Sequence, residues 1–210
     1  MPLVSRMVRV KVCGITNIDD ALLAVDLGAS AVGFVFWRNS PRYVEPGKAR
    51  DIVARLPCDV SAIGVFVDPL ENEVRSVVED VGLTAIQLHG DERPQFYQAL
   101  AFRTIKAVGV TGRETISEVL TIPDNVMVLL DANDKILRGG TGKTTDWDIA
   151  FEIASTRRVF LAGGLTAGNV AQAIATVRPY GIDVSSGVES APGLKDRSRL
   201  RKFFKAVKSL

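Results

Sequence analysis

Residues 8–36 read VRVKVCGITNIDDALLAVDLGASAVGFVF, and the order of apolar and amphipathic segments in this stretch decides the fold. Two short runs, Val8–Cys13 and Ala31–Phe36, are rich in Val and Phe, as buried parallel strands tend to be. Between them, Ile18–Leu27 carries apolar residues on one helical face, and Gly28 is a typical helix stop. The stretch therefore predicts a strand–helix–strand unit.

The same strand-then-helix unit recurs about eight times along the chain. The further expected strands are Val60–Phe66, Thr84–His89, Thr104–Val108, Val126–Asp131, Val159–Ala162 and Ile182–Ser185. The further expected helices are Pro46–Leu56, Leu70–Val81, Glu92–Ala101, Arg113–Leu120, Trp147–Ser155, Ala167–Val177 and Arg197–Ser209. A doubly wound open sheet is the competing architecture, but the turn after the first strand lacks a GxGxxG loop. We therefore predict an α/β fold in which residues 1–210 form a single (β/α)8 TIM-barrel domain.

The composition argues against several classes of function. A net charge of +2 over 210 residues gives no support for nucleic-acid binding, and the bases of Lys195–Lys208 are spaced as on the solvent side of a helix. Two cysteines and one histidine are too few for a disulfide framework or a zinc site of usual composition. Neither a membrane-spanning run nor a signal-peptide stretch is visible. We expect a cytoplasmic protein without a nucleic-acid or membrane partner, and the sequence leaves monomer and homodimer open.

The ends of the strands carry the candidate acid–base residues, because TIM barrels build their active sites there. Strand alternation points Lys11 and Cys13 into the barrel, and Asp183 on the neighbouring eighth strand is a candidate partner for the buried lysine. A nearby cation favours thiolate, so Cys13 is a candidate base or nucleophile whose pKa Lys11 would lower; a small buried hydrophobe is the alternative. Asp131 closes the sixth strand as a candidate acid or as a loop cap.

Other strand ends offer groups that could bind a ligand. Gln87 and His89 share the inward parity, and His89 either contacts a ligand or orders neighbouring polar groups. Arg42, in the loop after the second strand, suits a planar carboxylate, with a plain surface arginine as the alternative.

Two glycine- and serine-rich loops follow the seventh and eighth strands, where TIM barrels often bind phosphate. Glycine lets backbone N–H groups come close to an anion, so these loops suit an oxyanion-binding site. The alternative is that they are simply two tight turns. The residues concerned are Gly163, Gly164, Ser185, Ser186 and Gly187. The stretch 139–144, which includes Gly140, does not match P-loop spacing, and we interpret it as a glycine-rich loop that closes over the site.

Taken together, these motifs resemble the phosphoribosylanthranilate isomerases over nearly the whole chain. The motifs are Lys11-Val12-Cys13-Gly14-Ile15-Thr16, Gly33-Phe34-Val35-Phe36 with Ser40-Pro41-Arg42, Gln87-Leu88-His89-Gly90, Leu130-Asp131, Gly140-Thr141-Gly142-Lys143 with Asp146-Trp147, Ala162-Gly163-Gly164-Leu165, and Asp183-Val184-Ser185-Ser186-Gly187-Val188-Glu189. Each is weak alone, but their order and spacing are specific.

The resemblance implies an Amadori rearrangement of a phosphosugar substrate in tryptophan biosynthesis, without metal or cofactor. It implies Asp131 as general acid, Cys13 as general base, Arg42 as the carboxylate ligand, and backbone N–H groups near Gly164 and Ser186 as phosphate ligands. Three rival functions are an indole-glycerol-phosphate synthase, an isomerase of the analogous histidine-pathway sugar, and a silent barrel that only binds a sugar phosphate. The short leader, the cysteine on the first strand and the presence of an acid–base pair argue against them in turn.

Overall fold

The computed structural model describes residues 8–132 and 145–209, and eight parallel strands in it close into a barrel. The first strand pairs with both the second and the last, so the sheet has no free edge. The strands are β1 (Arg9–Cys13), β2 (Ala31–Val35), β3 (Ser61–Phe66), β4 (Ala85–Leu88), β5 (Thr104–Val110), β6 (Met127–Ala132), β7 (Val159–Leu161) and β8 (Gly181–Val184). The predicted (β/α)8 barrel is confirmed.

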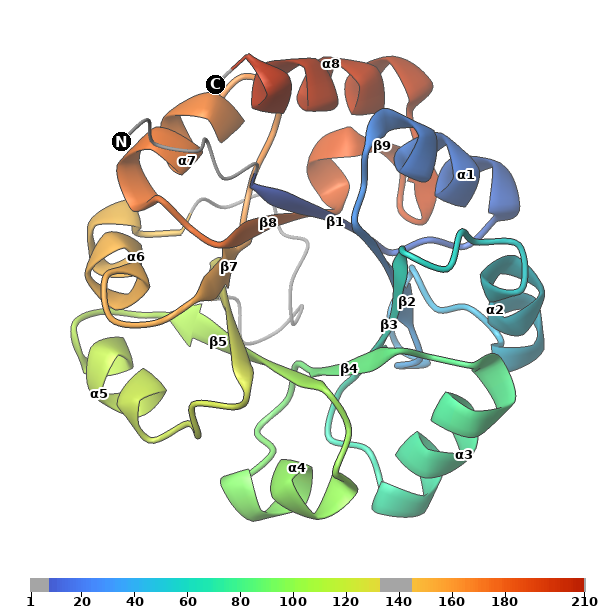
Figure 1. Ribbon diagram of the computed structural model, residues 1–210, viewed down its shortest axis with the longest axis horizontal. Helices are drawn as coiled ribbons and strands as arrows, with labels where there is room; N and C mark the ends of the chain where they lie inside the picture. Colours follow the sequence, from blue (N-terminus) through green and yellow to red (C-terminus); the bar gives the residue numbers. More distant parts are fainter. Residues whose placement is uncertain (1–7, 133–144, 210) are drawn as a thin grey trace.

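The helices form a ring outside the strands (Figure 1). They are α1 (Ile18–Leu27), α2 (Pro46–Val53), α3 (Glu71–Val81), α4 (Pro94–Leu100), α5 (Glu114–Leu120), α6 (Trp147–Ala154), α7 (Val170–Val177) and α8 (Arg197–Lys208). Helix α1 shows how local sequence sets their ends. The Asn17 side chain accepts a hydrogen bond from Asp20 N, and Gly28 ends the helix in the left-handed conformation, at φ 112°.

Strand alternation divides the buried side chains into two layers. Outward-facing residues such as Val12 and Leu130 pack under the helices in the larger apolar cluster. Inward-facing residues such as Ile63, Leu129 and Phe160 fill the barrel interior in a second cluster. At the carboxyl ends of the strands the barrel interior is polar instead, and the site lies there. Across residues 8–132 and 145–209, no helix combines the length and apolar character needed to cross a bilayer.

Several element boundaries differ from those expected from the sequence. Helix α4 begins at Pro94 rather than Glu92, since the residue before a proline avoids helical geometry and Glu92 instead accepts hydrogen bonds from the Gly90 N–H. A short helical turn η1 (Ser186–Val188) and a hairpin of β9 (Glu189–Ala191) and β10 (Leu194–Lys195) follow β8. The sequence did not predict this hairpin, because strands of three and two residues are too short to show a period.

Candidate active site

A buried ion pair joins the first and last strands of the barrel. The Lys11 ammonium donates to both carboxylate oxygens of Asp183, at 3.0 and 3.1 Å, and the two residues are direct partners in the β1–β8 register. Their side chains are 0% and 8% exposed. Although burial lowers the pKa of Lys11, the charges and hydrogen bonds of Asp183 and Cys13 together outweigh it and raise that pKa above its ordinary value. The partner predicted for Lys11 is confirmed.

Cys13 is two residues after Lys11 on β1 and points to the same face of the strand. Its thiol lines the pocket, and its partner on β2 is Gly33, which has no side chain to crowd it. A Cβ at Gly33 would lie 2.9 Å from Cys13 Sγ and 3.0 Å from Lys11 Nζ. The hypothesis that the pKa of Cys13 is lowered is wrong in sign. Burial raises the pKa of the thiol, and the Lys11 ammonium only opposes that shift. Lys11 is already neutralised by Asp183, which limits how far it can offset the lost hydration of a thiolate.

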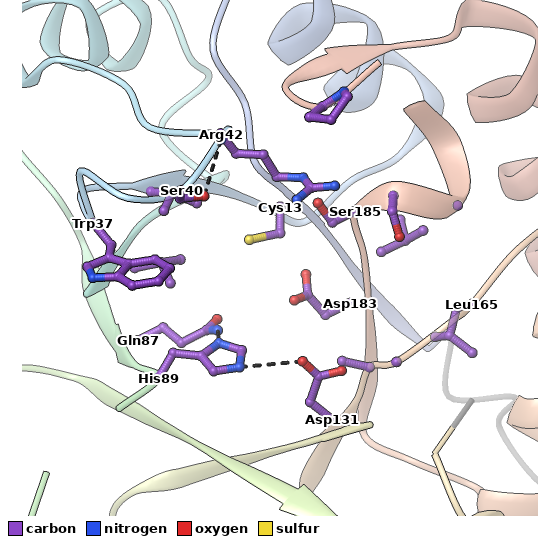
Figure 2. A pocket seen from close by; sticks show the side chains of 18 of the residues that line it. Cys13, Trp37, Ser40, Arg42, Gln87, His89, Asp131, Leu165, Asp183 and Ser185 are labelled. Carbon is purple, nitrogen blue, oxygen red and sulfur yellow. Dashed lines mark hydrogen bonds and ion pairs between the residues drawn. The ribbon is translucent and has the colours of Figure 1, made fainter. Parts of the chain in front are cut away.

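Asp131 enters the pocket from β6, on the far side of β7 and β8 from Cys13. Its Oδ1 accepts a hydrogen bond from Ala132 N at 2.8 Å, and its Oδ2 lies 3.4 Å from His89 Nε2. His89 Nδ1 is in turn 3.0 Å from Gln87 Nε2, which confirms the shared inward parity of the two β4 residues. The three side chains form a row along the pocket wall (Figure 2).

Arg42 reaches the pocket from the loop after β2 and is clamped from behind by Glu189 of β9. Its Nε lies 3.0 and 3.1 Å from the two Glu189 oxygens, and its Nη2 donates to Oε2 at 2.7 Å. The Arg42 side chain is 13% exposed, so it is not a plain surface arginine. By contrast, Arg38 in the same loop is 78% exposed, with its guanidinium 3.8 Å from Glu45.

The loops after β7 and β8 line a further part of the pocket wall, with Ser185 near Arg42. Gly163 and Gly164 adopt positive φ angles of 84° and 60°, and a Cβ at Gly187 would collide with the Leu165 carbonyl oxygen. Within the described residues, no hydrogen bond engages the N–H groups of Gly164, Ser186 or Gly187. The Ser185 hydroxyl is buried and has no hydrogen-bond partner there either. This part of the wall therefore offers several donors to an anion.

These groups surround one cavity of about 290 Å³ at the carboxyl ends of the strands. Figure 2 shows the Cys13 thiol and the Asp131 carboxylate pointing into it from different sides, with Asp183 between them. All but one of the residues predicted to form the site line this cavity, namely Cys13, Arg42, His89, Asp131, Gly163, Gly164, Ser185, Ser186 and Gly187. Gly140 and the glycine-rich stretch 139–144 lie outside the described residues. In the described part of the chain, no three His, Cys, Asp or Glu side chains group to hold a metal ion.

Two residues behind the pocket were missed or misread in the sequence. Glu189 was noted only as the end of a motif, yet its buried carboxylate holds Arg42. Lys195 was expected on the solvent side of the last helix, but its side chain is 0% exposed and lies in β10. The helix begins at Arg197, as expected, and the Asp196 side chain before it accepts from Arg199 N. The Asp196 cap is the sequence signal that could have placed Lys195 outside the helix.

Comparisons with known proteins show the family of the chain. The family model for N-(5'-phosphoribosyl)anthranilate (PRA) isomerase matches residues 10–206. The chain belongs to this family.

An N-(5'-phosphoribosyl)anthranilate isomerase of Pelobacter propionicus is 48% identical over 202 residues, which cover 96% of each chain. The crystal structure of the phosphoribosyl anthranilate isomerase from Thermotoga maritima superposes with a TM-score of 0.91 at 42% identity, covering 97% of this chain and 100% of that one. A second solved phosphoribosyl anthranilate isomerase, in complex with reduced 1-(o-carboxyphenylamino)-1-deoxyribulose 5-phosphate, has a TM-score of 0.87 at 41% identity with the same coverages.

The predicted activity is therefore confirmed at the level of the reaction. The chain is an isomerase of phosphoribosylanthranilate, an enzyme of tryptophan biosynthesis that interconverts an aldose and a ketose. The rival barrel functions are set aside, and the question becomes which side chains carry out the steps.

Proposed function

We propose that this isomerase works with Asp131 as general acid and Cys13 as general base on a substrate lying across the barrel mouth. Asp131 gives its proton to the furanose ring oxygen as the C1–O bond breaks, and the anthranilate nitrogen lone pair forms a C1=N Schiff base. The Cys13 thiolate then removes the proton from C2, the released electron pair forms the C1=C2 bond, and the electron pair of the C1=N bond returns to the nitrogen to give a neutral enolamine. Gain of a proton at C1 and loss of one from the C2 hydroxyl give the ketone.

The cavity wall offers separate groups for the two charged ends of such a substrate. We assign the anthranilate carboxylate to Arg42 and the phosphate to the Gly163–Gly164 and Ser185–Gly187 loops. The relative solved with reduced 1-(o-carboxyphenylamino)-1-deoxyribulose 5-phosphate supports this, since that ligand carries a carboxylate at one end and a phosphate at the other. His89 contacts Asp131 and is assigned to hold it and to contact the sugar. Gly140 remains a predicted substrate ligand.

One observation carries the acid–base assignment. A buried thiol from β1 and a carboxylate from β6 line the same cavity, together with Arg42 and the glycine- and serine-rich loops after β7 and β8. Facing acid and base groups are what the two proton transfers require, and each transfer is worth roughly 10²–10⁴ in rate.

A fluorescence time course tests the assignment. Phosphoribosylanthranilate is generated in place, and its signal is followed with wild-type protein, Cys13→Ser and the matched control Cys58→Ser. Cys58 is exposed and lies outside the cavity, so its replacement should leave the rate unchanged. We expect the Cys13→Ser rate to fall by roughly 10²–10⁴. A folded Cys13→Ser protein with wild-type turnover would remove Cys13 as the base, and a folded wild-type protein without turnover would contradict the reaction itself.

A further inference from the structure

Behind Arg42 lies a buried cluster of three charged side chains that the acid–base mechanism does not use. Glu189 Oε1 accepts from Lys195 Nζ at 2.8 Å while both Glu189 oxygens hold Arg42. The Glu189 and Lys195 side chains are only 4% and 0% exposed. Arg42 lines the cavity, whereas Glu189 and Lys195 do not. Any effect of these two residues on a ligand must therefore pass through Arg42 or through the pocket backbone.

The clamp on Arg42 uses one edge of its guanidinium and leaves the other edge available. Glu189 takes the side edge, formed by Nε and Nη2. A guanidinium carries five N–H donors, so Nη1 and the second hydrogen of Nη2 remain as an end-on pair. A planar carboxylate binds such a pair with two parallel hydrogen bonds. Fixing the side edge therefore decides where the carboxylate-binding edge points.

The charges of the cluster do not cancel. With Arg42 and Lys195 protonated, two cations share the single carboxylate of Glu189. Although burial acts to raise the pKa of Glu189, the hydrogen bonds and positive charges of Arg42 and Lys195 together outweigh it and hold that pKa below its ordinary value. Burial lowers the pKa of Lys195, and Glu189 opposes this shift. A buried positive charge is unfavourable without a nearby anion; Asp20, whose carboxylate accepts from Lys195 N, is one such anion, and a substrate carboxylate on Arg42 would add a second.

Lys195 also connects the cluster to the base. Its ammonium donates to the Cys13 carbonyl oxygen at 2.6 Å, and its backbone N–H donates to Asp20 Oδ2 at 2.8 Å. The chain of contacts from Arg42 through Glu189 and Lys195 thus ends at the last residue of β1. Arg42 and the end of β1 that carries the Cys13 thiol are therefore linked by a continuous set of buried hydrogen bonds.

From this geometry we infer that Glu189 is a positioning residue that aims the free edge of Arg42 at the substrate carboxylate, with Lys195 fixing this pair to the Cys13 end of β1. The chain's preference for an arylamine with an ortho-carboxylate is then set by Glu189 as well as by Arg42. The inference rests on the proposed role of Arg42 as the carboxylate ligand.

Two inhibitors separate positioning from general damage. One is reduced 1-(o-carboxyphenylamino)-1-deoxyribulose 5-phosphate, and the other is the same compound without the carboxylate. The ratio of their inhibition constants measures the carboxylate preference. Hydrogen bonds to charged groups predict a wild-type preference of roughly 10- to 100-fold.

The informative variants are Glu189→Gln and the double variant Glu189→Gln with Lys195→Met. Glu189→Gln raises the net charge of the cluster, so charge alone would strengthen the carboxylate preference, whereas loss of positioning weakens it. The double variant keeps the wild-type net charge and removes only the clamp. We expect the preference to fall to about threefold or less in both, with the affinity for the carboxylate-free inhibitor within about twofold of wild type. Glu152→Gln, which breaks the exposed Arg113–Glu152 pair, is the matched control and should change neither constant.

Each outcome decides the matter. A preference that stays the same or increases in the two variants overturns the inference, and so does an equal loss of affinity for both inhibitors, because that reports a collapsed pocket. Arg42→Ala tests the assignment on which the inference rests. If Arg42→Ala keeps the full carboxylate preference, the carboxylate role of Arg42 is wrong whatever Glu189 does.

Discussion

Replacing Lys11 with methionine removes the cation that pairs with Asp183 inside the barrel. Methionine fills similar space without charge, so the Asp183 carboxylate, only 8% exposed, is left buried without its partner. Breaking a buried ion pair in this way typically costs about 3–5 kcal/mol of unfolding free energy. The groups that face Asp183 in the variant are Cys13, Asp131 and His89, and none of them replaces the ammonium at hydrogen-bond distance.

The loss of unfolding free energy should depend on pH, because Asp183 becomes neutral when it takes up a proton. Burial already raises the pKa of Asp183 in the wild-type protein against the opposing Lys11 ammonium, and removing that ammonium raises it further above its unfolded value of about 3.9. The stability that protonation restores in the variant is therefore complete below that pH and is lost as the pH rises. At about 1.4 kcal/mol per pH unit, the ionised carboxylate costs at most about 1.5 kcal/mol at pH 5 and about 4 kcal/mol at pH 7. The deficit relative to wild type therefore grows across this range.

Urea denaturation at pH 5 and pH 7 measures both deficits, from the shift in midpoint at constant slope. The double variant Lys11→Met with Asp183→Asn carries no buried carboxylate at this position, so its deficit should be nearly the same at the two pH values. If Lys11→Met loses the same free energy at both pH values, or none at all, the unpaired carboxylate is not the cause and the account of the pair is wrong.

The remaining predictions concern the pocket. Asp131→Asn should lower kcat by roughly 10²–10⁴ without loss of fold, and near-normal turnover would remove Asp131 as the acid. Arg42→Ala should raise KM by roughly 10- to 100-fold with a smaller effect on kcat, and an unchanged KM would count against the carboxylate assignment. Gly33→Ala should cost about 1–3 kcal/mol of stability and slow turnover, since its Cβ would crowd Cys13 Sγ at 2.9 Å; a variant with wild-type stability and rate would contradict this packing argument.

The sequence predicted the barrel because each strand is a short apolar run and each helix shows apolar residues at helical spacing. It also predicted which side chains point inward, because side chains alternate between the two faces of a strand, so that Lys11 and Cys13 share one face. The Lys11–Asp183 pair followed from barrel closure alone, because a closed sheet makes the first and last strands neighbours.

The rest depended on contacts that no local pattern encodes. Glu189 clamps Arg42 across 147 positions of sequence, and the hairpin that carries it has no detectable period. The sign of the Cys13 pKa shift was missed because the cost of dehydrating a thiolate depends on how tightly the barrel closes around it. Proximity to Lys11 could be inferred from spacing, but the depth of burial could not.

The distance along the chain between Cys13 and its supporting residues has a consequence for how the enzyme is made. During synthesis, a nascent chain translated only through β7 already contains the thiol and the Asp131 carboxylate. It lacks Asp183, which neutralises Lys11, and it lacks Glu189 and the loop after β8. The first strand therefore holds an unpaired lysine until the last strand leaves the ribosome. Activity should appear abruptly rather than grow with chain length, and a truncated chain that ends before β8 should be recognised by proteases as unfolded.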